Sequence, residues 1–235
     1  MIFYKTLRPF KAISFDLDDT LYDNGPVIKK AEQQFLAYLN NTYEKLAELD
    51  ERRWNLYKAL IVKEDPSLKH DVTAWRRAAI QRVMIVHGIA PVHAITYSET
   101  ALQTFIALRS EVDVPNQSIE LLQQLAKHYP VVAITNGNVD VEKIGLQDKF
   151  QFVLKAGNGF KSKPDIVLFQ QAADQLGIQI SDLLHVGDHL NSDVFGAQQH
   201  DAQAVWFNPQ GAALNGAKLL PTIEMADLQD LLKLL

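Results

Sequence analysis

The chain has 235 residues, 47% of them hydrophobic, which suffices for one large domain or for a core with a smaller inserted domain. Its 23 lysines and arginines against 28 aspartates and glutamates give a net charge of −5, which argues against a nucleic-acid partner because polyanion binding needs a basic surface. The absence of cysteine excludes disulfides, thiol nucleophiles and thiolate metal sites, so any metal must bind oxygen or histidine ligands.

The first predicted strand spans residues 12–15 and ends at an acidic run in the sequence DLDDT, formed by Asp16, Asp18 and Asp19. Residues 24–112 then show helical periodicity and no clear strand, in stretches at 27–49, 51–63, 72–87 and 98–109. This segment carries 12 basic and 10 acidic residues, a charge of +2, which leaves −7 for the remainder. A slightly basic insertion with an acidic core suits an anionic substrate bound with a cation, although solvated helix faces would give the same count.

Strands and helices alternate after this insertion. Apolar runs predict strands at 131–134, 183–186 and 204–207, and helical spacing predicts helices at 118–128 and 164–176. Such alternation is typical of a doubly wound, Rossmann-like parallel α/β sheet, in which ligands bind beyond the carboxyl ends of the strands. We therefore predict an α/β core formed by residues 1–22 and 114–235, with an inserted helical cap at residues 23–113.

The acidic run after the first strand admits several interpretations, because like charges this close need a cation or a shared proton. Aspartates are also favoured in solvated turns and helix starts, whereas a calcium loop does not fit, since Leu21 stands where that loop requires glycine. The interpretation with the most chemical content is a carboxylate nucleophile. Asp16 would attack phosphorus, and Asp18 would serve as general acid for the leaving oxygen and then as general base for water.

The sequence DLDDT resembles the first motif, DxDxT, of the haloacid dehalogenase-like hydrolases. The other family motifs occur in order: Thr135 follows VVAI, Lys163 lies in KSKP, and Asp188 and Asp193 lie in GDHLNSD. The resemblance spans residues 13–206 and identifies the chain as a member of this superfamily, with its α/β core and inserted cap.

The resemblance implies a Mg²⁺ cofactor bound by the carboxylates of Asp16 and Asp188 and the backbone carbonyl of Asp18. An all-oxygen site agrees with the absence of cysteine. The resemblance also implies that Thr135 hydrogen-bonds the phosphoryl oxygens, although a strand-end threonine can instead make a local turn bond. Backbone amides would assist Thr135, namely those of Leu17, Asp18 and Asn136.

Lys163 is expected to pair with the nucleophile and with the transferring phosphoryl group, and Asp193 to orient Lys163 or a water on the metal. Lys161 competes for this role, but Pro164 is suited to a first helical turn and would place Lys163 at the mouth of that helix. An exposed loop lysine is the alternative for both positions. We interpret His185, inside an apolar strand, as a core histidine.

Asp18 favours a phosphatase over a dehalogenase, because dehalogenases of the superfamily attack carbon and need no acid two residues after the nucleophile. Phosphate transfer to an organic acceptor, as in phosphomutases, remains open because the same aspartyl phosphate serves both reactions. A non-catalytic binding protein is the alternative from another class. It is disfavoured because every motif position is filled.

A closer resemblance rests on FDLDDTLYDN, HDVTAWRR, VAITNGN and KSKPD, which together are similar to bacterial phosphatases acting on 5-amino-6-(5-phospho-D-ribitylamino)uracil, a riboflavin precursor. Those enzymes also accept FMN and other sugar phosphates, so we expect a small-molecule phosphate ester as substrate. Trp75 is a candidate for stacking on a uracil or flavin ring, and Arg76 or Arg77 for meeting a charged group. Alternatively, Trp75 lies at helical spacing with Ala79 and Arg82 and only packs the cap.

No apolar run approaches the roughly 18 residues of a membrane helix, and the first twenty residues lack the features of a signal peptide. We therefore expect a cytoplasmic protein without a membrane partner. Oligomeric state is not predicted.

Overall fold

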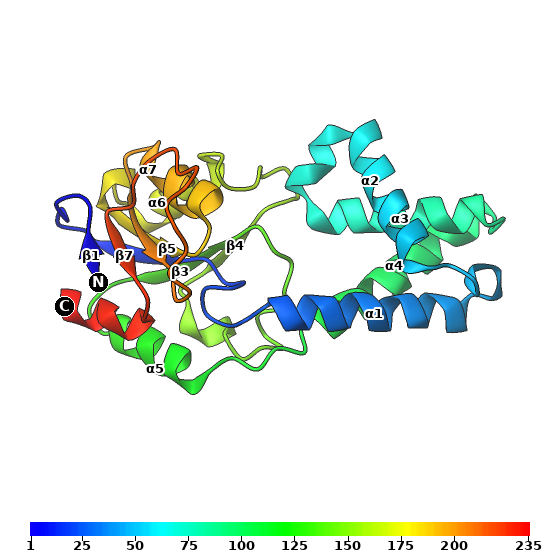
Figure 1. The fold of residues 1–235 in the computed structure, drawn as a ribbon, viewed down its shortest axis with the longest axis horizontal. Helices are drawn as coiled ribbons and strands as arrows, with labels where there is room; N and C mark the ends of the chain where they lie inside the picture. Colours follow the sequence, from blue (N-terminus) through cyan, green and yellow to red (C-terminus); the bar gives the residue numbers. More distant parts are fainter. The chain divides into compact units, whose positions relative to one another are not determined.

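The computed structural model describes residues 1–235, which divide into two compact units. The core unit comprises Met1–Asp23, Asp113–Gly137 and Gly145–Leu235, and the helical unit comprises Asn24–Val112 and Asn138–Ile144. Strands and helices alternate in the core unit, whereas the helical unit contains no strand (Figure 1). The segment Asn138–Ile144, which follows β3 in the sequence, belongs to the helical unit.

The core unit is built on one seven-stranded sheet. Its strands are β1 (Ile2–Phe3), β2 (Ala12–Phe15), β3 (Val131–Thr135), β4 (Val153–Lys155), β5 (Leu183–Gly187), β6 (Gln203–Phe207) and β7 (Ile223–Met225). They lie in the order β1-β7-β6-β5-β2-β3-β4, and every neighbouring pair is parallel except β1 and β7. This arrangement confirms the predicted parallel α/β class.

The central strands β2, β3 and β5 are buried along their whole length. Their sequences are therefore continuous apolar runs rather than alternating ones, as expected for strands covered on both faces. On one side, Leu168, Phe169 and Ala172 of a helix share an apolar cluster with Ala12 and Ile134 of the sheet. The helices of the core unit are α5 (Asn116–Leu125), α6 (Val167–Leu176) and α7 (Gly196–Gln198), with short 3₁₀ turns η3 (Gln147–Lys149), η4 (Ile180–Asp182) and η6 (Leu228–Leu234) and a π-helical turn η5 (Leu190–Phe195).

Helix α6 begins three residues later than predicted, at Val167 instead of Pro164. Asp165 Oδ1 accepts a hydrogen bond from the Val167 amide at 3.2 Å, so a short side-chain-bonded turn precedes the helix. Lys163 consequently lies in the loop ahead of α6, and the prediction that Pro164 forms the first helical turn is wrong. Gly177 ends α6 in the left-handed region with φ of 66°.

The helical unit contains the helices α1 (Gly25–Thr42), α2 (Glu51–Glu64), α3 (Val72–Val86) and α4 (Pro91–Arg109), with 3₁₀ turns η1 (Glu44–Leu46) and η2 (Pro66–His70). Their apolar faces meet in a separate core around Phe35, Trp54 and Phe105. Side chains cap two of the helices: Asp50 accepts from the Arg53 amide, and Asp71 accepts from two amides at the start of α3. The helical unit therefore has its own hydrophobic core.

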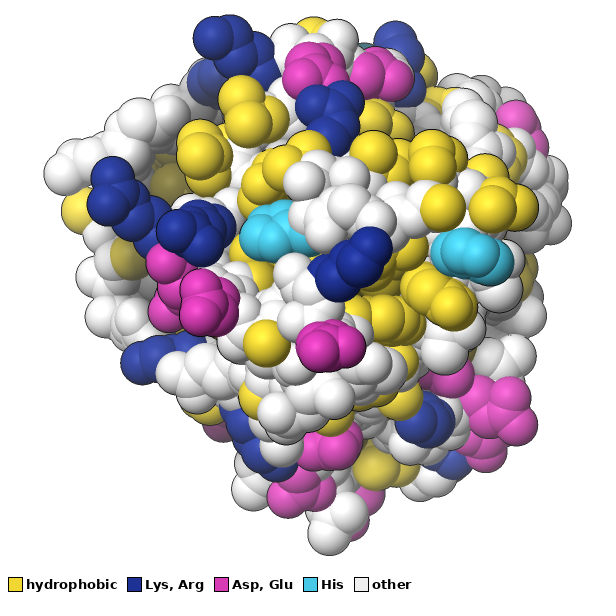
Figure 2. All heavy atoms as spheres, turned by 90° about the vertical axis from the view of Figure 1, so that its right-hand side faces the viewer, with side chains coloured by type: hydrophobic (Ala, Val, Ile, Leu, Met, Phe, Trp, Pro, Cys, Tyr) yellow, Lys and Arg dark blue, Asp and Glu magenta, His cyan; other side chains and the backbone are white.

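Surface charge and helix apolarity address the two partners considered above, nucleic acid and membrane. Figure 2 shows a face on which basic and acidic side chains are interspersed among hydrophobic ones, so this face is not uniformly basic. No helix in the structure combines the length and the apolarity needed to cross a lipid bilayer.

Candidate active site

The sheet register brings the sequence motifs to one edge. Strand β2 lies between β3 and β5, with Phe15 opposite Ala133 and Val186. Asp16 therefore follows β2 at the edge where β3 ends in Thr135 and where Asp188 follows β5. Carboxyl ends of neighbouring parallel strands meet at the same edge, which is where ligands bind in such sheets.

Lys163 is buried and fully hydrogen-bonded. Its Nζ donates to Asp16 Oδ1 at 2.7 Å and to the Ile134 carbonyl at 2.6 Å, and it lies 2.7 Å from Asp193 Oδ1. An ammonium group has three hydrogens, and each has an acceptor here. Lys161, in contrast, is exposed and 3.5 Å from Asp165. The structure thus brings Lys163, and not Lys161, to Asp16.

The side chain of Asn136 fixes the backbone of the lysine loop. Asn136 Oδ1 accepts from the Lys163 amide at 2.8 Å, and its Nδ2 donates to the Lys163 carbonyl at 3.0 Å. From the sequence only the backbone amide of Asn136 is expected to take part, because the partner of its side chain is 27 residues away along the chain. This pair of bonds ties the end of β3 to the loop that carries Lys163.

Asp193 receives donors on both carboxylate oxygens. Oδ1 is close to Lys163 Nζ and 3.1 Å from His185 Nε2, and Oδ2 accepts from the His189 amide at 2.9 Å. A Cβ at Gly187 would overlap the Asp193 carboxyl group, so a residue without a side chain is required there. These contacts support a role of Asp193 in orienting Lys163.

His185 is the core histidine that its apolar strand predicted, and it also connects two polar groups. Because an ionised carboxylate only accepts, Nε2 carries the hydrogen shared with Asp193, and Nδ1 accepts from Ser14 Oγ at 2.8 Å. Burial, together with the charge of Lys163, lowers the pKa of His185 to about 4, so the ring is neutral at neutral pH. Phe169 packs edge-on against the ring. The sequence pattern around His185 predicts neither of these hydrogen bonds.

Asp18 is held by Tyr22, a residue to which the sequence motifs assign no role. Tyr22 Oη donates to Asp18 Oδ1 at 2.6 Å. A Cβ at Gly137 would overlap Asp18 Oδ2, so glycine leaves the space that this carboxylate occupies. The Gly137 amide donates to Thr135 Oγ1 at 2.9 Å, which leaves the hydroxyl hydrogen of Thr135 for donation to another acceptor.

One buried cation, Lys163, is shared by two carboxylates. Burial raises the pKa of Asp16 to about 8, and the charges of Asp193 and Asp18 act in the same direction against Lys163. Burial also acts to raise the pKa of Asp193, but Lys163 and His185 outweigh it and hold that pKa below its usual range. Asp16 is therefore the carboxylate whose negative charge is compensated least.

The same edge of the sheet has a donor set suited to a metal ion. Oxygens of Asp16, Asp188 and Asp193 lie within 4.8 Å of one another. Burial raises the pKa of Asp188 to about 6, and the charges of Asp193 and Asp19 add to this effect. Asp193 has donors on both carboxylate oxygens, whereas Asp16 accepts from Lys163 on Oδ1 and Asp188 accepts from Thr20 at 3.3 Å on Oδ1. Asp16 and Asp188 therefore have oxygens left for a counterion. Buried carboxylate oxygens fit a divalent cation that prefers oxygen ligands.

The predicted substrate contacts of the insertion have partners within the helical unit. Trp75 is partly buried, and its Nε1 donates to the Lys58 carbonyl at 2.7 Å. Arg76 donates to Glu32 Oε1 at 2.8 Å, and its guanidinium lies over the ring of Phe105. These contacts favour the packing interpretation of Trp75. Its role in substrate binding, like that of Arg76, stays a prediction.

The family follows from comparison with known proteins. Residues 10–201 match the sequence profile of the haloacid dehalogenase-like hydrolases. The chain belongs to this family of hydrolases. It is 39% identical over 238 residues, spanning 100% of both chains, to the 5-amino-6-(5-phospho-D-ribitylamino)uracil phosphatase YigB of Escherichia coli strain K12. The predicted family is confirmed, and this haloacid dehalogenase-like hydrolase is a phosphatase.

Solved structures of the family share the fold. A crystal structure described as 2-haloacid dehalogenase from Pseudomonas syringae pv. Tomato DC3000 superposes with a TM-score of 0.90 at 34% identity, covering 95% of this chain and 97% of that one. A HAD phosphatase from Thermococcus onnurineus has a TM-score of 0.68 at 23% identity, with 96% and 97% covered, which shows the fold alone.

Proposed function

We propose that this haloacid dehalogenase-like phosphatase hydrolyses small phosphate monoesters through an aspartyl phosphate on Asp16, with Mg²⁺ as cofactor. One arrangement carries the proposal: Asp16 is hydrogen-bonded to buried Lys163 and lies beside Asp188, while a second carboxylate, Asp18, follows two residues later. A nucleophile, a fixed positive charge and a separate acid are the groups that phosphoryl transfer at a carboxylate needs.

In the first step, a carboxylate oxygen of Asp16 attacks phosphorus and the bond from phosphorus to the ester oxygen breaks. Asp18 gives its proton to that departing oxygen, so the product leaves as an alcohol. Lys163 and Thr135 stabilise the charge on the transferring phosphoryl group, together with the amides of Leu17, Asp18 and Asn136. The hydrogen bond from Lys163 to Asp16 Oδ1 holds the nucleophile in one orientation before attack.

In the second step, Asp18, now ionised, takes a proton from water, whose oxygen attacks phosphorus. The bond from phosphorus to Asp16 breaks, which releases inorganic phosphate and restores both carboxyl groups. Tyr22 holds Asp18 through both steps, because its hydroxyl donates to Oδ1. The same acid and base serve in turn, so no other titrating group is required.

Mg²⁺ would be held by the carboxylates of Asp16 and Asp188 and the Asp18 carbonyl, and when bound it supplies positive charge against the carboxylates and the phosphate dianion. The donor chemistry and the raised pKa values of Asp16 and Asp188 support this assignment. Asp193 is proposed as the residue that positions Lys163.

The favoured substrate is 5-amino-6-(5-phospho-D-ribitylamino)uracil, with FMN and other sugar phosphates as further esters. The support is the 39% identity over the whole chain to YigB, whose name states that activity. Ring stacking by Trp75 and charge recognition by Arg76 belong to this proposal with weaker support, because other groups of the protein already engage the indole nitrogen and the guanidinium.

A dehalogenase is the second candidate, because the similar structure from Pseudomonas syringae, at 34% identity, is described as a 2-haloacid dehalogenase. Attack on carbon would expel a halide, which needs no proton, and Asp18 would then have no role. Hydrolysis is distinguished from phosphate transfer and dehalogenation by a panel assay with and without Mg²⁺, using phosphate esters and 2-chloropropionate. We expect Mg²⁺-dependent phosphate release in water and no chloride release. Chloride release alone, or full activity in excess chelator, would contradict the proposal.

A further inference from the structure

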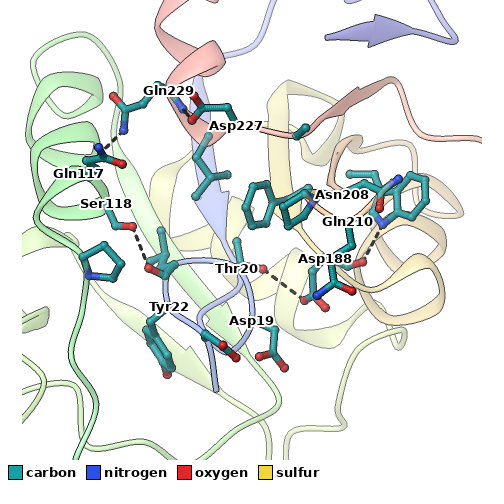
Figure 3. Close-up of a pocket in the computed structure, with 18 of the residues that line it drawn as sticks. Asp19, Thr20, Tyr22, Gln117, Ser118, Asp188, Asn208, Gln210, Asp227 and Gln229 are labelled. Carbon is teal, nitrogen blue, oxygen red and sulfur yellow. Dashed lines mark hydrogen bonds between the residues drawn. The ribbon is translucent and has the colours of Figure 1, made fainter. Parts of the chain in front are cut away.

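The peptide group between Asp188 and His189 is held at both of its ends. Its carbonyl oxygen, on Asp188, accepts a hydrogen bond from Trp206 Nε1 at 2.7 Å. Its N–H, on His189, donates to Asp193 Oδ2 at 2.9 Å. In Figure 3, dashed lines join Asp188 to this indole and, at its carboxylate, to Thr20. Because a peptide group is planar and rigid, bonds at its two ends fix the orientation of its plane.

The indole of Trp206 is itself fixed by the sheet. Trp206 lies in β6 opposite Gly187, the last residue of β5, and its N–H reaches the residue that follows that strand. Trp206 is 3% exposed and shares the apolar cluster of the sheet with Ala12 and Ile134. A buried indole N–H usually has an acceptor, and here the acceptor is the backbone of a proposed metal ligand.

Both bonds act on groups of the proposed metal site. The Trp206 bond fixes the backbone from which the Asp188 carboxylate extends, and that carboxylate lies within 4.8 Å of the Asp16 carboxylate. The N–H of the same peptide group bonds Asp193, which also contacts Lys163, and Lys163 donates to Asp16. One peptide group therefore connects the backbone of one metal ligand with the lysine that holds the other.

We propose that Trp206 is a positioning residue for the divalent cation, whose indole N–H orients Asp188 for metal binding through its backbone carbonyl. The proposal rests on the proposed function, because that function assigns Asp188 to the cation. Groups that hydrogen-bond metal ligands typically change metal affinity by about 10- to 100-fold. Trp206 lies 18 positions after Asp188 along the chain, in the next strand of the sheet, and no sequence motif includes it.

The first test compares two buried indoles. Trp206→Phe keeps an aromatic ring in the apolar cluster and removes the N–H donor. Calorimetric titration of the metal-free protein should show Mg²⁺ bound at least about tenfold more weakly than in the parent protein. Trp54→Phe is the matched control, because Trp54 is 1% exposed and donates its indole N–H to Glu32 within the helical unit. This control should leave the Mg²⁺ affinity unaltered.

Phosphate release separates positioning from a loss of packing. In Trp206→Phe, the Mg²⁺ concentration for half-maximal release should rise by a factor similar to that of the dissociation constant, while kcat at saturating Mg²⁺ stays close to the parent value. A lower melting temperature of the metal-free protein with an unchanged Mg²⁺ requirement would show that Trp206 only packs the sheet.

A nuclear magnetic resonance spectrum of the parent protein tests the contact even where Trp206→Phe does not fold. The chain has three tryptophans, so Trp54→Phe and Trp75→Phe assign the three indole N–H signals by elimination. We expect Mg²⁺ to shift the Trp206 signal and to leave the Trp54 signal in place.

The outcomes separate this inference from the proposed function. Unchanged Mg²⁺ affinity in Trp206→Phe, or a Trp206 signal that stays in place when Mg²⁺ binds, would overturn the role of Trp206 while leaving a Mg²⁺-dependent phosphatase intact. Absence of Mg²⁺ binding to the parent protein, with phosphate release unaffected by chelator, would overturn both.

Discussion

At the scale of single residues, the resting site leaves Lys163 without a spare N–H group, since its three hydrogens already have acceptors. An incoming phosphoryl group must therefore take over one of these bonds. The bond to Asp16 is the one best placed to change, because negative charge moves from the carboxylate to the phosphoryl oxygens as the aspartyl phosphate forms. We expect Lys163 to follow that charge while Asp193 keeps its own bond.

Asp16→Asn should abolish detectable phosphate release, because an amide cannot act as the nucleophile, while thermal unfolding stays cooperative. Asp18→Asn should lower kcat by about 10² to 10⁴-fold, the usual contribution of general acid–base catalysis. Phosphate release and circular dichroism measure the two properties separately. Substantial activity in Asp16→Asn would contradict the covalent mechanism.

His185 should matter for activity through the hydrogen bond to Asp193. A bond to a charged group contributes about 1.5 to 3 kcal/mol, so His185→Leu should lower kcat by about 10- to 100-fold. His185→Gln keeps an N–H donor and should retain more activity than His185→Leu, even where the two have similar melting temperatures. If activity followed melting temperature alone in both variants, His185 would only be packing the core.

The motif residues were predictable because each follows an apolar run that ends in polar residues. The contacts made by Ser14, His185 and Tyr22 were not predictable. These residues lie within apolar runs or beside the motif, and their local sequence does not indicate a function. Ser14 and His185 are 171 residues apart and meet only because β2 pairs with β5, where the two are opposite each other. Strand order and register had to be known before their contact could be inferred.

At the scale of elements, prediction succeeded where burial on both faces produces continuous apolar runs, as in β2, β3, β5 and β6. The edge strands β1 and β4 and the three-residue β7 were missed because they are short, and β1 and β4 are also partly exposed. Helix α4 begins at Pro91, seven residues before the predicted start at Ser98, with the proline in its first turn.

Trp75 in α3 gives a prediction at this scale. Its indole donates to the Lys58 carbonyl of α2, so it links two helices of one unit. We expect Trp75→Ala to lower the melting temperature and, because the ring is also proposed to stack on the substrate, to reduce kcat/KM for FMN more than for glycerol 3-phosphate. Replacing a fully buried aromatic side chain by alanine typically lowers the free energy of unfolding by about 3 to 5 kcal/mol. The loss is expected to be smaller for Trp75, because it is only partly buried. Equal losses on both esters would show that Trp75 only packs the helical unit.

At the scale of the whole molecule, stability should depend jointly on pH and Mg²⁺. Burial raises the folded-state pKa of Asp188 to about 6 and that of Asp16 to about 8, above the ordinary value of 3.8. A raised carboxyl pKa means that the folded state holds protons more tightly than the unfolded state. Without metal, the contribution of these two groups is therefore greatest below pH 4 and is lost as pH rises from 4 to 8.

Mg²⁺ competes with these protons, so it should raise the melting temperature more at pH 8 than at pH 5. At a concentration 100 times its dissociation constant, a ligand stabilises the folded state by about 2.7 kcal/mol. Thermal unfolding with and without Mg²⁺ at both pH values measures this effect, and Asp188→Asn, which removes one ligand, should diminish it. An equal shift at both pH values would contradict the assignment of the metal to these carboxylates.

Two glycines of the site limit how this enzyme can be engineered. Replacement of glycine by alanine is a common route to thermostability, because it restricts the unfolded chain where the native backbone permits a side chain. Gly137 and Gly187 both have backbone angles outside the left-handed region, so a design based on backbone angles alone would select them. A methyl group at either position would displace Asp18 or Asp193. A variant that included these changes would be more stable to heat. It would, however, displace the proposed general acid, Asp18, or the carboxylate of Asp193 that holds Lys163.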